Sequence, residues 1–502
     1  MFGIGHGLNV FVNHAAPFIA AQKSNTGSNP VPPGTEYATV HQLGEQMSRP
    51  GAFTSVDLVN YLQARIRTLD PALNSVIELN PKALEAAREL DRERASGKVR
   101  GPLHGIPILV KDIVEVEGMQ TSAGALGLVG APVSKNAPVI QRLIDQGAIV
   151  LGTTNLTEMA GFRGGPDGYS RRGGQTRNPH DPNADVGGSS SGSAAAVAAG
   201  LAPLAVGTET NGSIIVPAAL NGVVGLKPSV GLLDRDGIIP ASRRQDTPGP
   251  MARSVWDAAL MLNAMAGSPT GAEAVDYTRQ LVPGALAGKR IGYPTTFSDD
   301  GVTLPVVNSK QFNETLEVLR KQGAILVPIN MRLADASRYD ELLLCDVKQA
   351  LNGYLAKREG LPVKSVKELI TFNEALDGTQ TDHQPVLKEI DASILTPEQS
   401  QAPWDELLRD FRNTVDAPIK EHNLDAIVSD FDSNSYFGVA AAGYPGITVP
   451  SGATEDGLPA SAYFFGTAGS EAQLLGVAYG FEQGAQAAIR PTLSTPHALA
   501  NP

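Results

Sequence analysis

Apolar residues along the chain recur at helical spacing in some stretches and form short continuous runs in others. The pattern is helical throughout 37–100, most clearly from Leu58 to Leu69 after Thr54 or Ser55 as the helix cap. Further helices are expected over 139–147, 255–265, 312–322 and 472–483. The continuous runs predict buried strands, over 106–110, 148–152, 204–207, 290–293, 324–328, 424–428 and 442–450.

The alternation of these strands and helices predicts an α/β fold built in layers. We expect a flexible N-terminal extension over 1–36, one domain over 37–490 with its core in 101–260, and a short tail over 491–502. Residues 335–415 are mostly helical with polar patches, which is typical of an insertion or a lid.

Composition and charge limit the classes of function. The 502 residues are 42% apolar and 18% charged, which is enough for a large core. The net charge of −12 argues against binding to nucleic acids and to anionic membranes. No apolar run reaches the roughly 20 residues that span a bilayer. No Lys or Arg precedes Lys23, so we expect a cytoplasmic protein, with a degenerate export signal as the alternative.

The reactive residue types that often carry catalysis are sparse. The one cysteine, Cys345, rules out an internal disulfide and a cysteine-based zinc site. It lies in an apolar helical run and is predicted to be buried and inert. His104 and His180 are each predicted to have a structural role rather than a catalytic one.

Two glycine-rich loops that carry serine are the strongest candidates for chemistry. They cover 187–192 and 210–213, and the second leads into an expected helix start over 213–219. Glycine allows a sharp turn close to a ligand, and the free N–H groups of a helix start suit an oxyanion. Lys111 ends the strand over 106–110 and, taken alone, is expected to reach solvent. The two loops and the lysine together favour an acyl-transfer site over ordinary turns.

Six motifs carry a resemblance to a known family. They read PILVKD from Pro107, GGSSSGSAAA from Gly187, GTETNGSIIVPAA from Gly207, GVVGLKPS from Gly222, DTPGPMARSV from Asp246 and AGYPGITVPSG from Ala442. In these motifs the chain resembles the amidase signature family, and 172–179 and 234–240 are most similar to its peptide-amidase branch. The resemblance implies a central mixed, twisted β-sheet with helices covering both faces.

The resemblance also implies a Ser–cis-Ser–Lys triad. Ser213 matches the nucleophile, Ser189 matches the serine that follows a cis peptide bond and relays a proton, and Lys111 matches the base. A lysine accepts a proton only when it is neutral, and burial lowers its pKa towards that state. The implied oxyanion hole and supporting residues are the N–H groups of Thr210, Asn211, Gly212 and Ser213, with Gly188 and Ser190 beside them.

The function implied is an amidase that cleaves a carboxylic amide C–N bond through an acyl-enzyme on Ser213. It would release ammonia or an amine, and it would use no metal and no cofactor. Two positions depart from the family pattern. Ile215 replaces the usual arginine, which disfavours glutamine-type substrates. Asn211 stands where peptide-amidase relatives often carry aspartate, which disfavours a cationic substrate group.

Other functions with related chemistry stay open at this point. One is a carbamate hydrolase with the same triad, and another is an A-type amidotransferase subunit that makes ammonia for a tRNA-dependent partner. The pattern G-x-S-x-G over 188–192 also fits a nucleophile elbow, but no hydrophobic strand precedes it. We expect a monomer or homodimer that acts on a small-molecule amide or a related acyl substrate.

Overall fold

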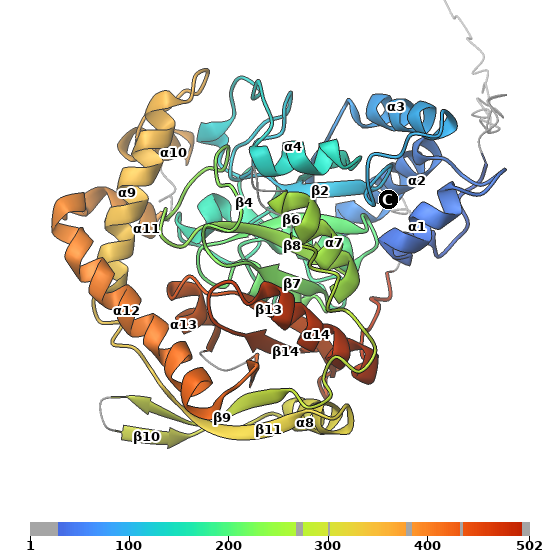
Figure 1. Ribbon diagram of the computed structural model, residues 1–502. Coiled ribbons are helices and arrows are strands. Elements are labelled where there is room, and N and C mark those ends of the chain that lie inside the picture. Colours follow the sequence, from blue (N-terminus) through green and yellow to red (C-terminus); the bar gives the residue numbers. More distant parts are fainter. Residues whose placement is uncertain (1–28, 268–274, 300–301, 378–383, 432–434, 494–502) are drawn as a thin grey trace, which may run out of the picture.

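The computed structural model describes residues 29–267, 275–299, 302–377, 384–431 and 435–493 (Figure 1). The predicted extension over 1–36 and the predicted tail over 491–502 lie largely outside these residues. Among the described residues, no helix is long and apolar enough to cross a membrane.

A twelve-stranded mixed sheet forms the centre of the molecule. Its strands are β1 Val76–Leu79, β2 Pro107–Lys111, β3 Ile149–Thr154, β6 Leu204–Glu209, β7 Val224–Lys227, β8 Thr247–Ala252, β9 Arg290–Asp299, β10 Val302–Pro305, β11 Ile325–Arg332, β12 Ala426–Asp430, β13 Gly446–Ala453 and β14 Pro459–Phe465. They lie in the order β1-β3-β2-β6-β8-β7-β13-β14-β12-β9-β10, and β11 also pairs with β9. A separate ribbon consists of β4 Tyr169–Ser170 and β5 Gly174–Gln175.

Helices cover both faces of the sheet. Their bounds are α1 Val40–Met47, α2 Ser55–Leu69, α3 Ala83–Ala95, α4 Pro138–Asp145, α5 Ser191–Ala198, α6 Ile215–Leu220, α7 Val255–Ala266, α8 Lys310–Lys321, α9 Tyr339–Lys357, α10 Val366–Asp377, α11 Pro385–Ala392, α12 Pro397–His422, α13 Ser435–Ala441 and α14 Glu471–Ala485. Short 3₁₀ turns lie at η1 Thr35–Tyr37, η2 Asp70–Ala72, η3 Leu126–Leu128 and η4 Glu158–Gly161. Helices α5 and α6 pack together on one face, and α4, α7 and α14 pack together on the other.

Most predicted elements are present, but two parts of the prediction are wrong. The stretch over 37–100 is not helical throughout, because β1 lies between α2 and α3 and pairs antiparallel with β3. The strand expected over 442–450 begins only at Gly446, because α13 ends just before it and 442–445 form the turn.

Strand β8 was not predicted, because Pro248 and Pro250 argue against a central strand. The structure accommodates both prolines by limiting the pairing on one side. Strand β8 pairs with β6 along its whole length, but β7 pairs only with Met251 and Ala252. The prolines therefore face no ladder partner on the β7 side.

The sheet brings the candidate loops to one edge. Strands β2 and β6 are parallel neighbours, so their carboxyl ends meet there, and β8 begins at the same edge because it runs antiparallel to β6. Helix α5 follows the first loop and packs against β2, β6 and β8. Its residues are small and all buried. This composition allows the close approach, since a side chain at Gly192 would collide with the backbone of Asn155.

The region predicted as an insertion forms α9 to α12, drawn in yellow to orange along one side of the molecule (Figure 1). A second apolar cluster joins this region to the sheet. It includes Tyr339 and Trp404 of the insertion and Ile215 of α6, the helix that follows the second glycine-rich loop. The insertion is thus packed against the element that carries the candidate nucleophile.

Candidate active site

Lys111 is the last residue of β2 and is completely buried. Its Nζ lies 2.7 Å from Ser189 Oγ and 2.9 Å from Ser190 Oγ. It also lies 3.0 Å from Thr208 Oγ1 and 3.2 Å from the Thr208 carbonyl oxygen. The expectation that Lys111 taken alone reaches solvent is wrong, because three hydroxyls and a carbonyl replace water around its amine.

Burial lowers the pKa of Lys111 from 10.5 to about 7. The negative charges of Glu209 and Asp246 act in the opposite direction but do not outweigh burial. A large share of Lys111 is therefore neutral near pH 7, and a neutral amine can accept a proton.

The hydrogen bonds around Lys111 indicate which hydroxyl can face its lone pair. A neutral amine donates two hydrogen bonds and accepts one, so one hydroxyl must donate to it. Ser190 Oγ donates to the Thr208 carbonyl oxygen at 3.0 Å, which occupies the proton of Ser190. The donor is therefore Ser189 or Thr208, and Ser189 makes the shortest contact at 2.7 Å.

The first loop is tied to the second by its backbone. The peptide bond between Gly188 and Ser189 is cis, as the resemblance implied. The N–H of Ser190 donates to the Ser213 carbonyl oxygen at 3.0 Å, and the N–H of Thr157 donates to the Ser189 carbonyl oxygen at 3.0 Å. A side chain at Gly188 would collide with the Thr157 hydroxyl, so the loop passes here only as glycine.

The second loop follows β6 and presents unbonded N–H groups. Among the described residues, none of the N–H groups over 210–213 donates a hydrogen bond to the protein. Gly212 adopts a φ of 76°, which glycine adopts without strain. The N–H groups of Ile214 and Ile215 are occupied by Glu209 Oε2, at 2.7 and 3.0 Å. The free donors are thus confined to the predicted oxyanion loop, and α6 begins at Ile215 rather than at Ser213.

The structure brings the predicted site residues together with one gap. Lys111 contacts Ser189 and Ser190 directly, and the backbone of Ser213 contacts Ser190. Both Ser189 and Ser213 are buried. Among the described hydrogen bonds, none joins the hydroxyl of Ser213 to that of Ser189. The chemical roles of these serines stay predictions.

Side chains outside the predicted set also hold the second loop. Thr210 Oγ1 donates to Asp246 Oδ1 at 2.7 Å, and burial raises the pKa of Asp246 to about 6. Asn211 Nδ2 donates to the hydroxyl of Tyr339 at 3.0 Å. Asp246 lies in a motif that sequence reasoning quoted without assigning it a role. Tyr339 lies in the insertion, where the sequence carries no comparable signal.

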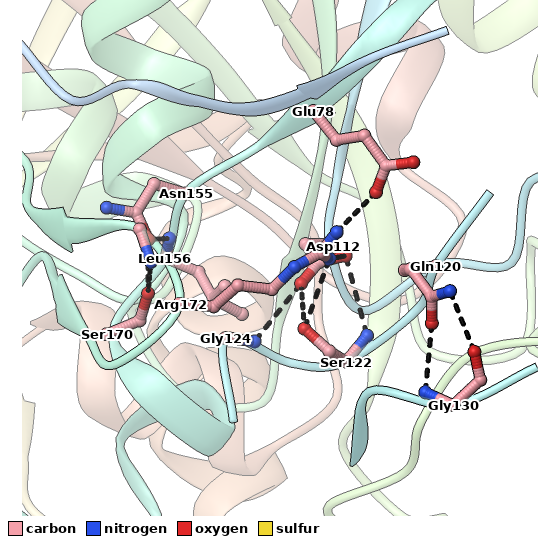
Figure 2. A network of polar contacts seen from close by, with 11 residues as sticks. Glu78, Asp112, Gln120, Ser122, Gly124, Gly130, Asn155, Leu156, Ser170 and Arg172 are labelled. Carbon is pink, nitrogen blue, oxygen red and sulfur yellow. Dashed lines mark hydrogen bonds and ion pairs between the residues drawn. The ribbon is translucent and has the colours of Figure 1, made fainter. Parts of the chain in front are cut away.

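A buried ion pair supports the chain directly after Lys111 (Figure 2). The fully buried carboxylate of Asp112 accepts from Arg172 Nη1 at 3.0 Å, from the N–H of Gly124 at 3.2 Å and from the hydroxyl of Ser122. Arg172 also pairs with Glu78 of β1. Figure 2 shows Arg172 reaching between the two carboxylates. Arg172 was quoted only as part of a branch-specific motif, and its contacts give that motif a physical role.

Replacing Arg172 with methionine is expected to destabilise the fold by about 3–5 kcal/mol, because Asp112 would lose its buried cation. The loss should grow with pH. Burial raises the pKa of Asp112 and Arg172 lowers it, so the substitution raises that pKa further. The native state then keeps a proton that the unfolded state releases, and stability falls as pH rises through this window. Urea unfolding at several pH values measures the effect.

Arg320→Met is the matched control for this prediction. Arg320 pairs with Glu317 on the surface, where the side chains are 55% and 59% exposed. Such a pair contributes only about 0–1 kcal/mol. Adding Asp112→Asn to Arg172→Met should restore part of the stability and remove the pH dependence. Equal unfolding midpoints for Arg172→Met and Arg320→Met would contradict the role given to Arg172.

The histidines and the cysteine have the structural surroundings predicted for them. The ring of His104 bonds the Leu90 carbonyl oxygen at 3.0 Å and accepts from the N–H of Arg100 at 3.1 Å. The ring of His180 bonds the Asn221 carbonyl oxygen at 3.1 Å. Cys345 is buried, and its thiol donates to a backbone carbonyl at 3.2 Å.

Comparison with known proteins agrees with this fold and site. The family model described as Amidase matches residues 57–429. A probable amidase of Arabidopsis thaliana is 37% identical over 447 residues, which cover 86% of each chain. The solved structure of a peptide amidase from Stenotrophomonas maltophilia is 42% identical, with a TM-score of 0.83, and the match covers 91% of this chain and 99% of that one. One component of the glutamyl-tRNA(Gln) amidotransferase of Chloroflexus aurantiacus is 34% identical over 468 residues, covering 86% of this chain and 94% of that component.

A mixed sheet flanked by helices, with a buried lysine beside two serine-bearing loops, defines a hydrolase that acts on amide C–N bonds. The chain belongs to the amidase signature family. The expected family, fold class and amidase activity are confirmed.

Proposed function

We propose that Ser213, Ser189 and Lys111 form the catalytic triad of this amidase. The observation that carries the proposal is the buried amine of Lys111, 2.7 Å from the hydroxyl of Ser189, in a loop whose next residue bonds the backbone of Ser213. A serine hydroxyl needs an adjacent base to become a nucleophile, and burial gives Lys111 a pKa of about 7.

In the proposed reaction, Ser213 Oγ attacks the carbonyl carbon of the substrate amide. The proton of Ser213 passes to Ser189, and the proton of Ser189 passes to neutral Lys111. The oxyanion of the tetrahedral intermediate accepts hydrogen bonds from the free N–H groups over 210–213. When the C–N bond breaks, the leaving nitrogen receives the proton back from Lys111 through Ser189. Water then attacks the acyl-enzyme by the reverse relay and releases the carboxylic acid.

Gly188 and Ser190 support this arrangement. Ser190 Oγ bonds Lys111 Nζ, and Ser190 also accepts from the N–H of Thr208 at 3.2 Å, so it fixes the lysine relative to β6. Gly188 lets the first loop pass close to Thr157. Neither residue needs to exchange a proton with the substrate.

We propose that the substrates are neutral carboxylic amides, including the C-terminal amides of peptides. The 42% identity to a peptide amidase supports this class. Ile215 is completely buried in an apolar cluster, so the position that usually holds arginine offers no charge to a substrate carboxylate. The insertion, packed against α6 through the same cluster, supports a role for 335–415 in shaping the pocket.

The test is ammonia or amine release from a matched panel. It comprises a peptide C-terminal amide, the same peptide as an aryl amide, an aryl carbamate and free glutamine. The proposal expects turnover of the peptide amide and the aryl amide, and far slower turnover of glutamine. A preference for the carbamate would transfer the assignment to a carbamate hydrolase. A preference for glutamine would contradict the neutral-amide class.

An amidotransferase subunit is the second candidate, because 34% identity relates this chain to one. Such a subunit needs partner chains, and Ile215 argues against its glutamine substrate. We propose instead a cytoplasmic monomer or homodimer that works without partner chains. Ammonia release by the purified chain, with its mass measured by light scattering, tests this. Activity only in a complex with other subunits would contradict it.

A further inference from the structure

The hydroxyl of Tyr339, the first residue of α9, reaches from the insertion to the oxyanion loop. It accepts from Asn211 Nδ2 at 3.0 Å and from Gln245 Nε2 at 2.9 Å. Tyr339 is only 4% exposed, so water does not compete freely for these bonds. A buried hydroxyl with two side-chain partners holds them in a fixed relative position.

The ring of Tyr339 is held separately from its hydroxyl. It packs edge-to-face against Trp404 and Phe411 of α12 and against Phe437 of α13, with ring centroids 6.0, 6.1 and 5.0 Å away. Such contacts orient an aromatic ring without help from a polar group. The ring position therefore belongs to the insertion, and the hydroxyl transmits that position to Asn211.

The other end of the oxyanion loop is held by the residues next to Gln245. Asp246 accepts from Thr210 Oγ1 at 2.7 Å, and Gln245 Nε2 lies 3.4 Å from the Thr210 carbonyl oxygen. The loop has no backbone hydrogen bond through its own N–H groups among the described residues. Side-chain contacts from Tyr339, Gln245 and Asp246 therefore fix the direction in which those N–H groups point.

We infer that Tyr339 is a positioning residue for the oxyanion hole, acting through Asn211 and Gln245. The inference rests on the proposed function, because it assigns the N–H groups over 210–213 to the oxyanion. The oxyanion forms only as the carbonyl is attacked, so a displaced loop weakens the transition state more than the bound substrate. The loss should appear in kcat and leave KM nearly unchanged.

Tyr339→Phe removes the hydroxyl and keeps the ring. We expect kcat for a peptide amide to fall about five- to tenfold, the effect of one lost hydrogen bond, with KM within about twofold of wild type. A peptide aldehyde, to which the hydroxyl of Ser213 adds to give a hemiacetal, should bind more weakly by the same factor. Tyr354→Phe is the matched control, because Tyr354 lies on the same helix and its hydroxyl bonds Glu115 at 3.1 Å. It should leave kcat and aldehyde affinity unchanged.

A double-mutant cycle separates positioning from general stability. If Tyr339 acts through Asn211, then Tyr339→Phe should have no further effect on kcat in an Asn211→Ala background. Wild-type kcat in Tyr339→Phe would overturn the inference, and so would full additivity with Asn211→Ala. A raised KM with unchanged aldehyde affinity would also overturn it. Failure of the proposed function is distinct, since it would appear as retained activity in Ser213→Ala.

Discussion

Replacing Ser213 with alanine is expected to lower kcat for amide hydrolysis at least about ten-thousandfold, because no other hydroxyl can form the acyl-enzyme. The fold should survive, since the backbone bond from Ser190 to the Ser213 carbonyl oxygen does not involve the side chain. Initial rates with a peptide amide and thermal unfolding midpoints measure both effects.

Ser461→Ala is the matched control for this substitution. Ser461 is buried, and its hydroxyl lies 3.4 Å from the Ala219 carbonyl oxygen of α6, the helix that follows Ser213. Its loss should change kcat less than about threefold, because it removes one long hydrogen bond away from the reacting atoms. Substantial turnover by Ser213→Ala would contradict the assignment of the nucleophile.

Replacing Lys111 with methionine is expected to lower kcat/KM about a hundred- to ten-thousandfold, the usual contribution of a general base. In the wild type, kcat/KM should rise with pH through about 7, because Lys111 must lose its proton to act. This acidic limb should be absent from the residual activity of Lys111→Met. A wild-type pH profile in the variant would contradict the role of Lys111.

The same substitution makes a prediction about stability, with a defined sign. The pKa of Lys111 is lowered from 10.5 to about 7 in the native state. Between these values the unfolded state carries a proton that the native state lacks, so wild-type stability rises with pH, by up to about 1.4 kcal/mol per unit. Lys111→Met lacks this dependence. Its stability relative to the wild type should be greatest below pH 7 and should decrease as pH rises towards 10.5. Parallel curves for the two proteins would contradict the burial of a neutral lysine.

Much of the site could be predicted because its parts are local in sequence. The two glycine-rich loops follow one another across one helix and one strand, and the apolar run before Lys111 predicts β2. What could not be predicted is the burial of Lys111, since hydroxyls from the first loop and from Thr208 replace its water only in the folded sheet.

The missed supporting residues act over long separations. Arg172 bonds Asp112 across 60 positions, and Tyr339 bonds Asn211 across 128. No spacing rule connects such pairs, because the topology of the sheet and the packing of the insertion bring them together. Strand β8 was missed for a different reason, since its prolines are compatible with a central strand only where one neighbour leaves them unpaired.

The most direct test of the proposed triad is the site of covalent modification by a fluorophosphonate. Its adduct is not readily hydrolysed, so a missing adduct cannot result from rapid turnover. Intact-mass measurement and peptide mapping should show one phosphonyl group per chain, on Ser213. The adduct should be absent in Ser213→Ala and should form slowly in Lys111→Met. A phosphonyl group on another residue, or full labelling of Ser213→Ala, would contradict the triad.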